Sequence, residues 1–108
     1  MATWEDVRRI AAALPDTEET TTHRNPCFKV RGKTFVNVSR EPGAIATRAS
    51  AEDVELLIRA KPDVYFITPH YVGWNAVLAR LDAIDEEELA GRLEDAWEFM
   101  SSKTKRRA

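Results

Sequence analysis

The chain has 108 residues, of which 44% are hydrophobic and 31% are charged, so it can build one hydrophobic core and one domain. No run of eighteen apolar residues occurs, which excludes a membrane-spanning helix, and the first residues lack the basic and apolar regions of a signal peptide. The lone cysteine, Cys27, has no internal disulfide partner, which fits a reducing compartment. We therefore expect a cytoplasmic protein.

The first predicted helix begins after Thr3 and ends before Pro15. Thr3 is followed three residues later by Asp6, a pattern in which the cap and the carboxylate satisfy free backbone N–H groups. Apolar residues then recur at helical spacing and are expected to face the core. The run from Thr17 to His23 is rich in β-branched residues and is expected to form an edge strand.

An antiparallel meander is predicted next. Its expected strands are residues 27–31, 34–38 and 44–48. Gly32 and Lys33 suit the central positions of a type II′ turn between the first two strands. With that turn, Val30 would lie opposite Phe35. A Pro-Gly pair marks the second turn of the meander.

A second helix is predicted after the cap Ser50, ending before Pro62, and a third after the cap Asp85. The two strands expected between these helices are residues 64–67 and 75–81. Strands grouped between helices favour an α+β two-layer sandwich, with the helices on one face of an antiparallel sheet. The other face is expected to be partly open to solvent. Residues 1–100 would form the domain, and residues 101–108 a basic, disordered tail.

Charge is segregated along the chain, although the formal net charge is only −2. Between residues 23 and 48, Glu41 is the one acidic residue among six basic residues. Between residues 82 and 98, Arg92 is the one basic residue among eight acidic residues. This asymmetry is compatible with an anionic partner, although an acidic total weakens long-range attraction to nucleic acid.

Three motifs resemble a known family. They are Ala-Leu-Pro-Asp-Thr-Glu-Glu at 13–19, Asn-Pro-Cys-Phe-Lys-Val-Arg-Gly-Lys at 25–33 and Pro-His-Tyr-Val-Gly-Trp at 69–74. With the acidic final helix that contains Trp97, they make nearly the whole chain similar to small bacterial proteins of the MmcQ/YjbR family. The resemblance implies a frataxin-like (CyaY-like) fold and the family's usual label of DNA-binding protein, with loops on the sheet as a double wing. It implies no catalytic residues.

The basic meander is the candidate nucleic-acid site. Its expected phosphate contacts are Lys29, Arg31, Lys33, Arg40 and Arg48. The alternative is a solvated strand face whose charges keep the sheet edge from aggregating. The third helix is acidic and would be repelled by phosphate, so no recognition helix is evident and no sequence-specific readout is expected. The expected function is non-enzymatic DNA binding.

His70, Tyr71 and Trp74 form a second candidate surface. They could stack on a base or another ring, and His70 could exchange a proton near neutral pH. In the alternative, which we favour, Tyr71 and Trp74 anchor a short connection in the core while Gly73 supplies an unusual backbone angle. If the surface is functional, the chain would be a small-ligand or protein-interaction module.

The sequence contains no pattern that completes a catalytic or metal site. Cys27 lies in an expected strand and is predicted to be a small buried side chain, although His23 could approach it. The acidic run at 85–88 fans around a helix axis and would not converge on one ion. We therefore expect no enzyme activity, no cofactor and no metal, and the sequence leaves the oligomeric state open.

Overall fold

The computed structural model describes residues 1–22 and 24–105, with side chains described as far as residue 102. The helices are α1 (Trp4–Ala12), α2 (Ala51–Ala60) and α3 (Glu86–Lys105), with a 3₁₀ turn, η1 (Pro69–Tyr71). The strands are β1 (Thr17–Thr22), β2 (Asn25–Val30), β3 (Lys33–Val38), β4 (Ala44–Arg48), β5 (Tyr65–Phe66) and β6 (Ala76–Arg80). The predicted chain order of helix, strands, helix, two strands and helix is confirmed.

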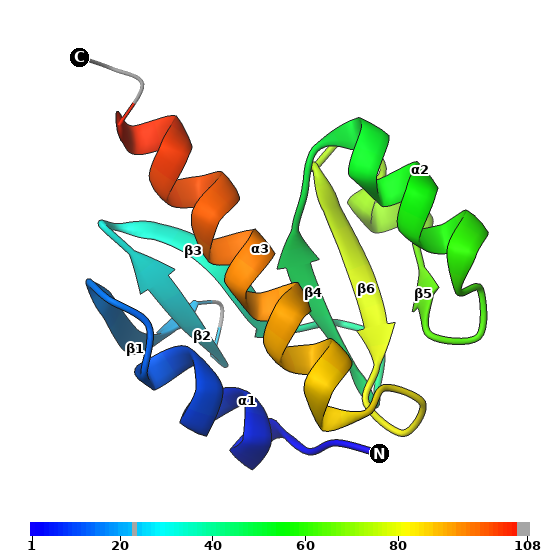
Figure 1. The fold of residues 1–108 in the computed structure, drawn as a ribbon, viewed down its shortest axis with the longest axis horizontal. Helices are drawn as coiled ribbons and strands as arrows, with labels where there is room; N and C mark the ends of the chain where they lie inside the picture. The colour runs from blue at the N-terminus through cyan, green and yellow to red at the C-terminus, as the bar shows by residue number, and fades with distance from the viewer. Residues whose placement is uncertain (23, 106–108) are drawn as a thin grey trace.

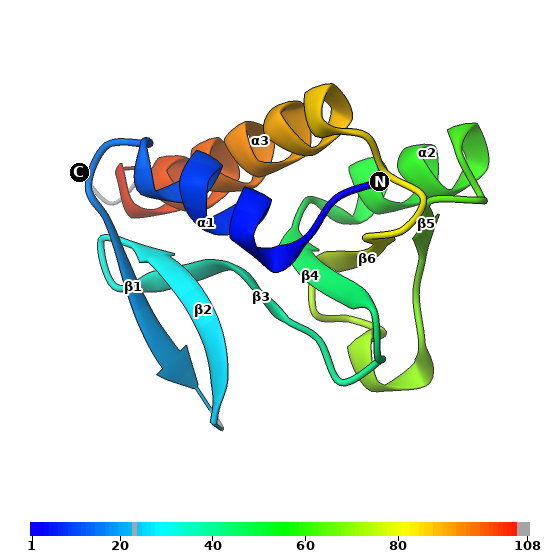
Figure 2. The ribbon, with the colours of Figure 1, turned by 90° about the horizontal axis from the view of Figure 1, so that it is seen from below.

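The six strands form one antiparallel sheet in the order β1-β2-β3-β4-β6-β5. The strand β6 therefore lies between β4 and β5, although β5 comes first in the chain. Figures 1 and 2 show α1, α2 and α3 on the same side of this sheet. The predicted α+β fold, with helices on one face of an antiparallel sheet, is confirmed. We call the side that faces the helices the helix face and the other side the open face.

The main hydrophobic core lies between the helices and the helix face. Its fully buried side chains include Val7 of α1, Leu89 and Leu93 of α3, and Phe35 and Ile45 of the sheet. Burial of side chains this size contributes about 1.5–3 kcal/mol each to folding. Among the described residues, no helix is both long enough and apolar enough to cross a membrane.

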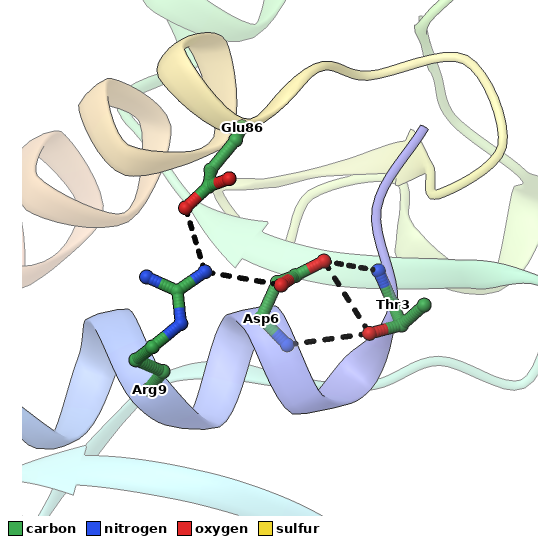
Figure 3. Close-up of polar contacts among 4 residues, drawn as sticks. All are labelled: Thr3, Asp6, Arg9 and Glu86. Atoms are coloured by element: carbon green, nitrogen blue, oxygen red, sulfur yellow. Dashed lines mark hydrogen bonds and ion pairs between the residues drawn. The ribbon is translucent and has the colours of Figure 1, made fainter.

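All three predicted helix caps are present. The hydroxyl of Thr3 accepts from the Asp6 N–H at 3.3 Å, and the Asp6 carboxylate accepts from the Thr3 N–H at 3.0 Å. The same carboxylate accepts from Arg9, whose guanidinium also contacts Glu86 at 2.6 Å, so the cap of α1 is joined to the start of α3 (Figure 3). The other two helices are capped in the same way. Ser50 caps α2, and at the start of α3 the Asp85 carboxylate accepts from the Glu88 N–H at 2.8 Å.

The predicted type II′ turn between β2 and β3 is wrong. The central residues are Arg31 and Gly32, with φ of 52° and 82°, and positive φ at both positions is typical of a type I′ turn. Val30 consequently pairs with Lys33 rather than with Phe35, and a register irregularity follows in β2. The physical reason is Asp16, whose carbonyl accepts from the Arg31 N–H and whose carboxylate lies 3.2 Å from the Arg31 guanidinium.

The helix α3 continues past residue 100, where the domain was expected to end. Ser101 is buried and its hydroxyl donates to the Glu98 carbonyl at 3.3 Å, so the packed part of α3 extends beyond Met100. The helical backbone reaches Lys105. The rest of the expected basic tail, 106–108, lies outside the described residues.

Candidate functional site

A cleft of about 600 Å³ lies on the open face of the sheet. Three of its lining residues, Ala46, Tyr71 and Ala76, belong to a small hydrophobic cluster that is separate from the helix-side core. The polar, basic and aromatic residues that line it are Thr22, Asn25, Thr34, Asn37, Arg40, Arg48, His70, Tyr71 and Trp74. We call this site the open-face cleft.

The small side chains of β4 and β6 create the depth of the open-face cleft. Ala44, Ala46 and Ala76 carry only a methyl group each, and the ring of Tyr71 packs against them. This packing holds η1 against the open face, so the connection between β5 and β6 becomes one wall of the cleft. Figure 2 shows the η1 turn on the side of the sheet opposite to the helices.

The three aromatic residues of this connection have different environments. Tyr71 is buried, as the anchoring interpretation predicts, but Trp74 is 49% exposed and His70 is exposed. The His70 ring lies 4.9 Å from that of Tyr71 and 5.6 Å from that of Trp74, between ring centroids. Gly73 has a φ of 85°, which disfavours a side chain there. Only Tyr71 therefore anchors the turn, and the other two rings face the cleft.

Arg40 and Arg48 lie against this aromatic wall. The Arg40 Nη1 is 3.2 Å from the His70 Nδ1. Because a guanidinium only donates hydrogen bonds, the ring nitrogen is the acceptor in this contact. The Arg48 Nη1 donates to the Trp74 carbonyl, and its guanidinium carbon lies 5.8 Å from the Trp74 ring centroid, a cation–π contact. Burial lowers the pKa of the Arg48 guanidinium from its usual value, although arginine remains charged.

The cleft has an uncompensated positive charge. No carboxylate is among its lining residues, and within the described part of the chain no carboxylate lies within ion-pair distance of Arg40 or Arg48. Arg40 is exposed and Arg48 is partly buried, and guanidiniums that lack a carboxylate partner favour an anionic ligand.

The other predicted phosphate contacts lie outside this cleft. Arg31 is at the β2–β3 turn and forms its ion pair with Asp16. Lys33 is exposed at the same turn, and Lys29 lies partly buried opposite Thr34. The structure thus divides the predicted basic set, because Arg40 and Arg48 join the aromatic surface while Arg31 and Lys33 do not.

Sequence reasoning did not single out the uncharged polar residues of the cleft, which are Thr22, Asn25, Thr34 and Asn37. Asparagine is disfavoured in strands, so Asn37 in the interior of β3 was the available signal. Its amide group donates to the Val38 carbonyl at 2.8 Å.

A second cavity, of about 390 Å³, lies between α2 and α3 and has the opposite charge. Its four carboxylates are Asp85, Glu87, Glu88 and Asp95, against the two cations Lys61 and Arg92. Glu88 accepts from Lys61 at 2.8 Å and from the Tyr65 hydroxyl at 2.6 Å, and these hydrogen bonds lower the pKa of Glu88. Burial, together with the bond to Glu88, raises the pKa of Tyr65. Glu88 thereby connects α3 to β5 and to the end of α2.

Cys27 is fully buried, as predicted, and burial raises the pKa of its thiol, which disfavours the reactive thiolate. His23, the residue that could have approached it, lies outside the described residues. Among the described residues, no group of three or more histidine, cysteine, aspartate or glutamate side chains is arranged to hold a metal ion.

These features define a class of small α+β proteins with helices on one face of an antiparallel sheet and a basic, aromatic cleft on the other. A family model described as YjbR matches residues 12–99. The chain belongs to the YjbR family, which confirms the resemblance found in its motifs.

The relatives of known sequence and structure agree with this assignment. Proteins of Mycobacterium tuberculosis and Mycobacterium bovis, each named as uncharacterized, are 35% identical to the chain, and the alignments cover 95% of this chain and 92% of each relative. The crystal structure of a Deinococcus radiodurans protein with a DUF419 domain has a TM-score of 0.81 at 22% identity, over 96% of this chain and 82% of that chain. At this identity the likeness shows the fold alone.

Proposed function

We propose that the chain is a non-enzymatic protein that binds nucleic acid on the open face of its sheet, with phosphates against Arg40 and Arg48. The observation that supports this proposal most is that two guanidiniums meet in one cleft that has no carboxylate in its lining. Arginine binds phosphate bidentately and is the side chain best suited to this contact. Cytoplasmic location is part of the proposal and is supported by the single buried thiol of Cys27.

The proposal moves the contact surface away from the tip of the β2–β3 hairpin. Arg31 at that tip is already paired with Asp16 and would have to give up this partner to bind phosphate. Lys29, which lies opposite Thr34 of the cleft, extends the positive surface along β2. The acidic helix α3 covers the other face, so no helix is available for reading bases, and binding without sequence specificity follows.

A salt series tests the proposal. Fluorescence anisotropy would follow the binding of labelled oligonucleotides of about twelve nucleotides, both single-stranded and as a duplex, between about 50 and 200 mM salt. We expect dissociation constants of roughly 1–100 μM at low salt, with affinity falling linearly on a log–log plot. Arg40→Gln should weaken binding and reduce the salt slope by about 1.

Arg59→Gln is the matched control, because Arg59 is an exposed arginine on α2, on the other side of the sheet. This variant removes the same charge and should leave the affinity within about two-fold of the wild type. Binding weaker than about millimolar for both forms of DNA at low salt, or affinity independent of salt, would contradict the proposal.

A second candidate function is the binding of a small ligand in the same cleft. The observation that favours it is the volume of about 600 Å³, which is within the range of small-molecule sites, together with the exposed rings of His70 and Trp74. Thermal unfolding with individual nucleotides and aromatic carboxylic acids would test it. A rise in Tm that Arg48→Gln abolishes is expected for this candidate, and no rise with any compound would count against it.

A further inference from the structure

We infer that the nucleic acid held in the open-face cleft is single-stranded, with one base stacked on Trp74 and the adjoining phosphates at Arg40 and Arg48. This inference rests on the proposed function and adds the form of the partner. It depends on three features of the cleft, namely an exposed ring held in place, a recessed shape and polar groups on its floor.

The indole of Trp74 is held in position before any ligand arrives. The Arg48 guanidinium donates to the Trp74 carbonyl and also lies over the indole ring, so one arginine fixes both the backbone and the ring. Trp74 nevertheless remains 49% exposed. An exposed aromatic ring beside cationic groups is the arrangement by which proteins bind single strands, because every base has a face that can stack.

The shape of the open face favours a single strand over a duplex. Figure 2 shows the β1–β2 hairpin and the β5–η1 segment extending to the side of the sheet away from the helices, and the cleft is lined from both of them. A duplex keeps its bases stacked inside and exposes only its backbone and the groove edges of its bases, so no base face is free to stack on an aromatic ring. The unstacked bases of a single strand can enter and reach Trp74.

The floor of the cleft offers hydrogen-bonding groups instead of a closed apolar surface. Asn25, Thr34 and Asn37 are among its lining residues, and Asn37 lies opposite Ala46, whose side chain is only a methyl group. Amide and hydroxyl groups can bond with the edges of an unpaired base. In a duplex the Watson–Crick edges are occupied by the partner base.

One comparison tests the inference separately from the proposed function. Anisotropy would be measured for one labelled strand of about twelve nucleotides, for the duplex made from it, and for competition by the free nucleoside monophosphate. We expect the single strand to bind at least about ten-fold tighter than the duplex, even though the duplex has the higher charge density. The free nucleotide should compete only at concentrations far above those of the unlabelled strand.

Variants of Trp74 then test whether a base stacks on its ring. Trp74→Ala should weaken single-strand binding by about ten-fold or more and leave duplex binding unchanged, whereas Trp74→Phe, which keeps a ring, should lose roughly three-fold or less. Val72→Ala is the control, because Val72 is an exposed apolar residue of the same connection and is not among the cleft residues.

The outcomes separate the two proposals. If neither form of DNA binds, the proposed function fails and this inference fails with it. If the duplex binds as tightly as the single strand, or if Trp74→Ala leaves single-strand binding unchanged, the inference alone is overturned. If the free nucleotide competes as well as the unlabelled strand, the cleft is a small-ligand site and the inference is also overturned.

Discussion

The two faces of the sheet use charged residues in opposite ways. On the helix side of the sheet, three basic residues each lie within 3.1 Å of a carboxylate, either on the same helix or on another part of the fold. These residues are Arg8, Arg9 and Lys61. On the open face, Arg40 and Arg48 contact an imidazole, a carbonyl and an indole. The difference teaches that charge on the helix face connects elements of the fold, whereas charge on the open face remains available to a ligand.

The apolar residues also differ between the two faces. The helix face buries a continuous core between the sheet and three helices, while the open face carries a small cluster around Tyr71 and Leu78. We therefore expect variants on the helix face to change stability and variants on the open face to change binding. The predictions that follow test this division, beginning with the largest expected effect.

Leu93→Ala should have the largest effect on stability. Leu93 is fully buried between α3 and the sheet, so its truncation leaves a cavity and should lower the free energy of unfolding by about 2–5 kcal/mol. Trp74→Ala should cost less than about 1 kcal/mol in spite of the larger side chain, because Trp74 is half exposed. Urea denaturation measures both values. Equal losses in the free energy of unfolding for the two variants would contradict the proposed difference between the two faces.

Glu88→Gln should lower stability by about 1–3 kcal/mol at neutral pH, because it removes the charged acceptor of the Tyr65 hydroxyl and of Lys61. The folded state lowers the pKa of Glu88, so its contribution is complete above the usual glutamate pKa and is lost as the pH falls through the folded-state value. The difference between wild type and variant should therefore shrink in acid.

Denaturation curves across a pH series measure this effect. Glu87→Gln is the matched control, since Glu87 is the adjacent exposed glutamate and should change stability by less than about 0.5 kcal/mol. A stability difference between wild type and Glu88→Gln that grows as the pH falls would contradict the predicted direction of this pH dependence.

Thr3→Ala should lower the free energy of unfolding by about 1 kcal/mol, because it removes the hydroxyl that caps α1 (Figure 3). Thr3→Ser keeps the hydroxyl and should retain most of the stability. Thermal unfolding followed by circular dichroism compares the two. If Thr3→Ser and Thr3→Ala give the same Tm, the hydroxyl cap does not contribute the predicted stability.

Arg31→Asn should have the smallest effect. Asparagine followed by glycine suits the type I′ turn, which offsets the loss of the exposed ion pair with Asp16, so stability should change by less than about 0.5 kcal/mol. Nucleic-acid affinity should stay within about two-fold, because Arg31 lies outside the cleft. An affinity loss as large as that of Arg40→Gln would show that the hairpin tip is part of the binding surface.

Local features of the fold were predictable from the sequence. Each helix cap depends on atoms only three residues apart, as in Thr3 with Asp6, so the sequence pattern contains the whole interaction. The turn between β2 and β3 was not predictable, because Arg31 adopts its positive φ next to Asp16, fifteen residues earlier in the chain. No short pattern contains that contact.

The site was predictable as two separate groups of residues but not as one cleft. Arg40 and His70 are 30 residues apart, and Arg48 and Trp74 are 26 apart. They meet because β6 pairs with β4, which depends on long-range strand pairing and not on local sequence. The exposure of Trp74 differs from the anchoring interpretation that the sequence favoured, because Tyr71 and not Trp74 packs against the alanines of β4 and β6.

The indole resonances of the three tryptophans provide the most direct test of binding at the open face. Trp4 and Trp97 pack against the helix-side core, and the Trp97 indole donates to the Pro15 carbonyl at 2.8 Å, whereas Trp74 lines the cleft. A ¹⁵N-labelled sample would be titrated with a single strand of about twelve nucleotides. Our account predicts that the Trp74 indole shifts and saturates while the other two indoles stay unchanged. A saturating titration that leaves Trp74 unmoved, or that shifts Trp4 and Trp97 instead, would contradict it.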